Sequence, residues 1–100
     1  MKFSLRQLEV FTALCHSQNM TRAAEQLSMS QSAASSALKE LERQFEVQLF
    51  DRIGKRLQIN ERGRSLRPHV EALLEQAAEV ESLLAGNGAS SSLKVGATLT

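Results

Sequence analysis

The chain of 100 residues suits one small domain, or one domain with an appendage, and its hydrophobic share of 42% is enough for one core. Aromatic residues make up only 4%, with no Trp and no Tyr, which argues against binding of single-stranded nucleic acid by base stacking. Through Arg67, the chain has eleven Lys or Arg against seven Asp or Glu, a net charge of +4. From Pro68 onward, it has one Lys against four Glu, a net charge of −3. We therefore expect only the first part to bind a polyanion.

The first predicted helix begins after Ser4, which opens an S-x-x-Q capping box. Leu8, Phe11 and Cys15 follow on one face, and the helix should end near residues 17–19. Because Cys15 is the single cysteine, an internal disulfide framework and a cysteine zinc site are excluded. We expect its thiol to pack in the core, as free cysteines commonly do.

Residues 21–42 carry the most informative pattern, two short amphipathic helices separated by a break at residues 27–30. Thr21 is the predicted N-cap of the first of these helices. Ser30 is the predicted N-cap of the second, with Ser28 as the alternative.

The second of these helices, ending near Gln44 or Phe45, has two unlike faces. Apolar residues spaced by 4, 3 and 4 form one stripe: Ala34, Leu38, Leu41 and Phe45. Polar and basic residues at the same spacing lie roughly opposite: Ser32, Ser36, Lys39 and Arg43. Such a helix packs one face on a core and offers a small, basic face to the outside, which is typical of a helix-turn-helix whose second helix enters the DNA major groove.

After Val47 the pattern changes to two short apolar-rich runs, residues 50–53 and 57–59, on either side of Gly54. We interpret them as a small β-hairpin, a wing, with Gly54 at the tight turn; an irregular loop is the alternative. Three cations make this segment basic: Arg52, Lys55 and Arg56.

Asn60 is the predicted N-cap of a long helix over residues 61–84. Apolar residues recur along it at heptad spacing: Leu66, Val70, Leu73, Ala77, Val80 and Leu84. A helix about 36 Å long cannot bury this seam on a domain of about sixty residues, so a second copy of the chain is the expected cover. Pro68 predicts a kink inside the helix, or else a helix that starts near Pro68.

The end of the chain suggests a further domain. Residues 85–92 have the composition of a flexible linker, and residues 93–100 alternate like a strand. The predicted organisation is therefore a winged helix-turn-helix over 1–60, a dimerisation helix over 61–84, a linker over 85–92 and the first strand of a truncated domain over 93–100.

Enzyme activity is not predicted. His16 and His69 are isolated, without a carboxylate pair or Ser-His-Asp spacing nearby. A Gly-rich phosphate loop and a cluster of metal ligands are both missing from the sequence, so we expect neither a metal nor a cofactor in this chain. Without a signal peptide at the N-terminus or an apolar run of about 18 residues, a cytoplasmic protein with no membrane partner is expected.

Several stretches together match one known family: LRQLEVF at 5–11, TRAAEQLSMSQSAAS at 21–35, LKELERQFEVQLFDRIGKRLQINERG at 38–63 and LKVGATLT at 93–100. Over essentially its whole length, the chain resembles the N-terminal region of LysR-type transcriptional regulators. The resemblance implies a mainly α fold, a winged helix-turn-helix of three helices and a small β-hairpin followed by a long dimerisation helix. It also implies a ligand-binding domain of periplasmic-binding-protein type that binds a small-molecule inducer.

The resemblance further implies partners and contact residues. The expected partners are AT-rich, partly palindromic promoter DNA and a second copy of the chain, with a tetramer for the full-length protein. The implied base contacts are Gln31, Ser32, Ser35, Ser36 and Lys39. The implied contacts to phosphates or the minor groove are Thr21, Ser30, Arg52, Lys55 and Arg56.

Gln31 is the best candidate for base recognition, because its amide can pair with adenine through two hydrogen bonds. The sequence departs from the family at Ser36, where many members carry Arg or His, and at Ala34, where many carry a branched apolar residue. Ser36 lacks the bidentate guanine contact that Arg makes. The alternative function is a protein–protein interaction module that uses its long helix only for assembly, but such a module would not need basic residues on both the helix and the wing.

Overall fold

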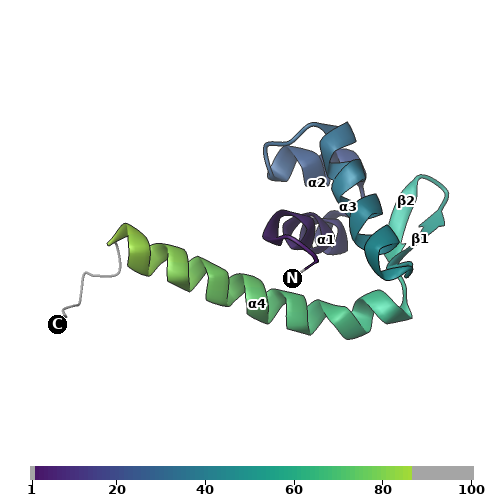
Figure 1. Cartoon of the computed structure of the whole chain (residues 1–100). Helices are drawn as coiled ribbons and strands as arrows, with labels where there is room; N and C mark the ends of the chain where they lie inside the picture. The colour runs from purple at the N-terminus through teal and green to yellow at the C-terminus, as the bar shows by residue number, and fades with distance from the viewer. Residues whose placement is uncertain (1, 87–100) are drawn as a thin grey trace.

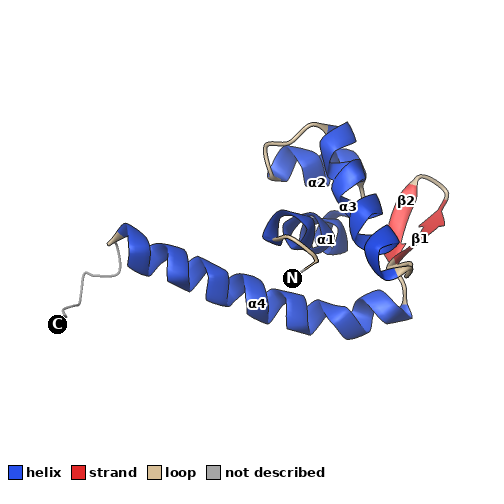
Figure 2. Ribbon diagram, viewed as in Figure 1, coloured by secondary structure: helices blue, strands red, loops and turns tan. Residues whose placement is uncertain are grey.

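The computed structural model describes residues 2–86 (Figure 1). Its elements, in chain order, are α1 (Leu5–Ser17), α2 (Met20–Gln26), α3 (Gln31–Phe45), β1 (Phe50–Ile53), β2 (Arg56–Ile59) and α4 (Glu61–Ala85). Figure 2 shows α1, α2 and α3 gathered on one side of α4, with the hairpin beside the start of α4. The mainly α fold with a hairpin wing is confirmed. The linker was predicted over 85–92, but Ala85 is the last residue of α4 and Gly86 is its C-cap. The rest of the predicted linker and the predicted strand over 93–100 lie outside the described residues.

Two helix starts follow the predicted capping. The Ser4 hydroxyl accepts the backbone N–H of Gln7 at 3.2 Å, and the Ser4 N–H donates to the Gln7 side chain at 3.0 Å, which completes the capping box. Ser30 accepts the N–H of Ala33 at 3.1 Å and caps α3. Ser28, the alternative cap, instead has a positive φ of 57° in the turn before α3.

The start of α2 corrects the prediction for Thr21. Asn19 is the N-cap: its backbone is extended, and its side-chain oxygen accepts the N–H of Arg22 at 3.0 Å. Asn and Thr are both good N-cap residues, so the pattern alone did not separate the two positions. Because α2 begins at Met20, Thr21 lies in the first turn and its hydroxyl is not used for capping.

The core lies where α1, α2 and α3 meet. Its buried residues include Phe11 and Leu14 from α1, Ala23 and Ala24 from α2, and Ala34, Leu38 and Leu41 from α3. Phe45, the last member of the predicted apolar stripe, is 43% exposed because α3 ends there, at the border of the core. Cys15 is half-buried and packs against the core, as predicted.

The wing is an antiparallel hairpin, so the loop alternative is wrong. Its register pairs Phe50 with Ile59 and Ile53 with Arg56. Gly54 occupies the turn with φ +63°, a conformation that glycine adopts without the steric cost of a Cβ. Arg56 belongs to β2 and not to the turn, because the turn needs only Gly54 and Lys55.

The hairpin is attached to the helices by backbone and core contacts. The Leu57 N–H donates to the Gln18 carbonyl at the end of α1 at 3.0 Å. The Phe50 ring meets the Phe11 ring edge-on, with 5.5 Å between the centroids. A two-stranded hairpin alone is marginally stable, so these contacts hold the wing in place.

α4 runs without interruption from Glu61 to Ala85. Asn60 caps it as predicted, accepting the Gly63 N–H at 2.9 Å. Because Pro68 lies inside the helix, the alternative that the helix starts near Pro68 is wrong. Val70 is 3% exposed and belongs to the core of the chain's own helix-turn-helix.

Candidate nucleic-acid interface

One polar surface is built from three separate parts of the sequence. The start of α2, the start of α3 and the wing surround a hollow of about 290 Å³. Its lining residues are Asn19, Met20, Thr21, Gln31, Ser35, Arg52, Lys55 and Leu57. Five of these were predicted contact residues, so the structure brings together side chains from both predicted contact groups.

The five candidate base-contacting residues share the outer face of α3. Gln31, Ser32, Ser36 and Lys39 are exposed, whereas Ser35 is half-buried. Ser35 lines the hollow described above and also a second one of about 500 Å³ between α3 and β1, which Lys39 and Arg52 border as well. The opposite face carries the buried Ala34, Leu38 and Leu41.

Two hydrogen bonds connect predicted contact residues to one another. The Thr21 hydroxyl donates to the side-chain oxygen of Gln31 at 3.2 Å. The Ser30 and Ser32 hydroxyls lie 3.3 Å apart, close enough for a hydrogen bond in either direction. Neither bond could be predicted from the sequence, because the first joins different helices and the second depends on side-chain rotamers.

The cations of the wing are available for an external anion. Arg52, Lys55 and Arg56 are exposed, and none of them forms a salt bridge with a residue in the range 2–86. Arg43, by contrast, is paired with Glu40, with 3.2 Å between Nε and Oε1. The wing therefore carries three unpaired positive charges beside the polar face of α3.

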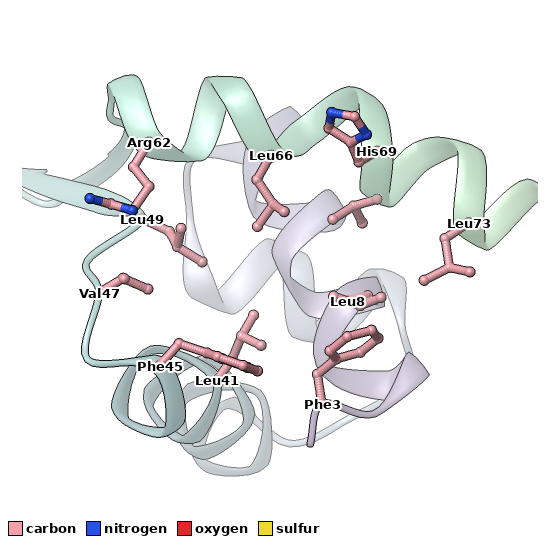
Figure 3. A pocket seen from close by; sticks show the side chains of 11 residues that line it. Phe3, Leu8, Leu41, Phe45, Val47, Leu49, Arg62, Leu66, His69 and Leu73 are labelled. Carbon is pink, nitrogen blue, oxygen red and sulfur yellow. The ribbon is translucent and has the colours of Figure 1, made fainter. Parts of the chain in front are cut away.

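An apolar groove lies apart from this polar surface, between the end of α3 and the first half of α4 (Figure 3). Its volume is about 350 Å³, and Figure 3 shows Leu66 pointing into it from α4, with Phe45 of α3 on the opposite side. The other lining residues are Phe3, Leu8, Leu41, Val47, Leu49, Arg62, His69, Val70 and Leu73.

The predicted heptad seam of α4 is divided between the inside and the outside of the chain. Val70 is buried, and Leu66 and Ala77 are half-buried. The remaining seam residues are increasingly exposed toward the C-terminal end, at 39% for Leu73, 53% for Val80 and 83% for Leu84. The C-terminal half of α4 thus presents an uncovered apolar row.

Other kinds of site find little support. Among residues 2–86, the structure offers no group of three or more His, Cys, Asp or Glu side chains placed to hold a metal ion. His16 and His69 are exposed, on α1 and α4 respectively. None of the helices in this range is both long enough and apolar enough to cross a membrane.

The fold and the polar surface define a winged helix-turn-helix domain with a basic wing. Residues 5–64 match the family model described as "Bacterial regulatory helix-turn-helix protein, lysR family". A transcriptional regulator of Escherichia coli K12, YeiE, is 57% identical over 83 residues, which are 83% of this chain and 28% of the relative. The RuBisCO operon transcriptional regulator of Allochromatium vinosum is 39% identical over 84 residues, again 28% of the relative.

Solved structures of this family have the same fold as the chain. OxyR of Corynebacterium glutamicum superposes with a TM-score of 0.82 at 30% identity, over 86% of this chain and 27% of that one. The DNA-binding domain of BenM, solved in complex with catB site 1 DNA, gives a TM-score of 0.75 at 25% identity, over 84% of this chain and 90% of that one. The chain belongs to the LysR family of bacterial transcription regulators and forms its DNA-binding domain. It spans about 28% of the length of the curated relatives.

Proposed function

We propose that this domain binds promoter DNA sequence-specifically as a dimer, with α3 in the major groove and the wing on the minor groove or its phosphates. The observation that carries the proposal is the shared surface of α3 and the wing, where unpaired cations flank an exposed polar helix face. The BenM domain, which has the same fold, was solved bound to DNA.

Base contacts are assigned to the outer face of α3. Gln31 offers an amide that matches the donor and acceptor of adenine in the major groove. The hydroxyls of Ser32, Ser35 and Ser36 donate or accept, or let thymine methyl groups approach. Lys39 lies one turn further along and reaches guanine or a phosphate.

Phosphate contacts are assigned to Ser30 and to the wing cations Arg52, Lys55 and Arg56. These positive charges release counterions from DNA, so they supply affinity that is independent of sequence and sensitive to salt. Thr21 was also predicted to contact phosphates, but its hydroxyl donates to Gln31.

The dimer is assigned to α4, through the uncovered row of Leu73, Val80 and Leu84. Charge along the helix favours an antiparallel pair of copies. Its first part carries Arg62, Arg64 and Arg67 against Glu61, whereas its second part carries Glu71, Glu75, Glu79 and Glu81 without a cation. In an antiparallel pair, the acidic half of one copy lies over the basic half and the apolar groove of the other.

The wider activity is also part of the proposal. In a longer protein of this family, a further domain binds a small-molecule inducer and supports a tetramer, and the regulator works in the cytoplasm. The alternative, a protein–protein interaction module assembling through α4, is disfavoured because it gives no use to unpaired cations beside α3.

The test is fluorescence anisotropy of the chain with an AT-rich inverted-repeat duplex and a scrambled duplex at two salt concentrations. Tighter binding to the repeat, weakened by salt, is the expected result. Equal binding to both duplexes would refute sequence-specific recognition of that repeat. Failure to bind either duplex, with a folded dimer present, would favour the protein-interaction alternative.

A further inference from the structure

Thr21 and Gln31 belong to different helices, yet the Thr21 hydroxyl donates to the Gln31 side-chain oxygen at 3.2 Å. We propose that Thr21 is a positioning residue, which fixes the amide of Gln31 for base recognition and so helps to set the sequence preference without touching a base. The inference rests on the proposed sequence-specific binding of DNA and adds a residue that acts through another.

The physical need for positioning comes from the amide itself. A glutamine amide has nearly the same shape after a half-turn, but the half-turn exchanges its acceptor oxygen and its donor NH₂. At a fixed place in the major groove, the two orientations offer opposite patterns to a base pair, so an unfixed amide discriminates poorly. The bond from Thr21 fixes the place of the amide beside α2, and in the structure the oxygen of Gln31 is the atom that faces the hydroxyl.

The bond leaves Gln31 able to recognise a base. A carbonyl oxygen has two lone pairs, so Oε1 keeps one after accepting from Thr21, and Nε2 keeps both of its hydrogens. Among the hydrogen bonds of residues 2–86, none uses Nε2 of Gln31. One acceptor site and two donors are sufficient for the bidentate contact with adenine.

The same bond argues against a phosphate contact by Thr21. Phosphate oxygens only accept, and a hydroxyl has one hydrogen to donate. While that hydrogen is given to Gln31, Thr21 has none for a phosphate. The nearby Arg52 and Lys55, which line the same hollow, are better suited to that task. The Thr21 hydroxyl is also free of capping, because Asn19 caps α2.

A double-mutant cycle tests the inference. Two duplexes are compared. The first is selected by the wild-type chain from a randomised pool. The second differs from it at the one base pair for which Gln31→Ala loses the wild-type preference. Thr21→Val, which keeps the shape but lacks the hydroxyl, should lower discrimination at that base pair by about fivefold. Thr21→Ser should retain the discrimination, and Thr21→Val should have no further effect in the Gln31→Ala background. Circular dichroism checks the fold of each variant.

Three results would overturn the inference. If Thr21→Val weakens binding to every duplex by the same factor, both in the wild-type and in the Gln31→Ala background, then Thr21 is a phosphate contact. If Thr21→Val changes neither affinity nor discrimination, the bond has no function. Both of these results leave the proposed function intact. A wild-type chain that does not distinguish the selected duplex from a scrambled one would overturn the proposed function and the inference together.

Discussion

Glu42, on α3, accepts the backbone N–H of Leu49 through its carboxylate at 2.8 Å. The Leu49 carbonyl in turn accepts the N–H of Asn60 at 3.0 Å, and the Asn60 side chain donates to the Gln48 carbonyl at 2.8 Å. One short segment therefore connects the end of α3, the start of the wing and the start of α4. The carboxylate that orients this segment belongs to α3, the helix whose outer face carries the candidate base contacts.

Glu42→Ala should lower the free energy of unfolding by about 1–3 kcal/mol, because it leaves the half-buried N–H of Leu49 without a partner. Glu42→Gln keeps an acceptor oxygen and should cost less. Urea unfolding measures both. The control is Glu40→Ala, which removes only the surface pair with Arg43 and should cost less than about 1 kcal/mol. Equal losses for Glu40→Ala and Glu42→Ala would contradict the role assigned to Glu42.

Gly63→Ala should destabilise the domain by about 1–3 kcal/mol through overpacking. A methyl group at Gly63 would lie 2.5 Å from the Leu49 carbonyl oxygen and 2.6 Å from Cγ1 of Ile59. The Leu49 oxygen is backbone, so it cannot move aside as a side chain would. Thermal unfolding provides the measurement, with Ser65→Ala at an exposed position of the same helix as control. A melting temperature unchanged by Gly63→Ala would show that α4 is not in close contact here.

The stability of the chain should fall as the pH rises from 9 to about 11, in part because of Cys15. Burial raises the pKa of its thiol from 9.0 to about 11; Arg67 lowers this pKa and Glu71 raises it. In that window the unfolded chain loses the thiol proton while the folded chain keeps it, so the free energy of unfolding declines with pH. Below pH 9 the thiol is protonated in both states, and its contribution to stability is fully retained. Urea midpoints across the window should fall less steeply for Cys15→Ala. Identical slopes for both proteins would refute the contribution of Cys15.

Leu73→Lys should convert the proposed dimer to a monomer, because it places a charge at the start of the exposed apolar row of α4. Operator binding should weaken as well, since one half-site gives few contacts. Light scattering gives the mass directly. Ala72→Lys, an equal change of charge at the neighbouring exposed position off the seam, should leave the dimer intact. A dimer that persists in Leu73→Lys would remove α4 as its interface.

Arg52→Ala should weaken binding to all duplexes alike and reduce the slope of log K against log salt by about 1, as expected for a lost phosphate contact. Arg43→Ala is the matched control, because this arginine is already paired with Glu40. Anisotropy titrations over a salt series measure both slopes. A loss confined to the preferred sequence would instead make Arg52 a base contact.

Local signals predicted much of the fold. Ser4, Ser30 and Asn60 are N-caps because each side-chain oxygen accepts the backbone N–H three residues further along, in the first turn of the helix. The break between the two helices and the hairpin at Gly54 likewise follow from short-range pattern. The error at Thr21 has the same origin, since Asn19 satisfies the same local rule.

Contacts between distant segments were not predictable in this way. The bond from Thr21 to Gln31 depends on how two helices cross, and the bond from Glu42 to Leu49 depends on how the chain turns after α3. The heptad pattern of α4 likewise did not show that Val70 packs within its own chain while Leu84 stays exposed. The candidate contact residues were found from pattern and resemblance, and the structure adds how they are held.

The unbroken course of α4 would set the distance between the two DNA-binding domains of the proposed dimer. Contacts at Gly63 and Val70 fix the first half of the helix to the DNA-binding body, and the helix continues without interruption to the exposed Leu84. One residue inserted between Val70 and Leu73 would rotate the apolar row beyond it by about 100° and shift it by about 1.5 Å. In the proposed dimer, the length of α4 would therefore set the distance between the two half-sites that the domains bind.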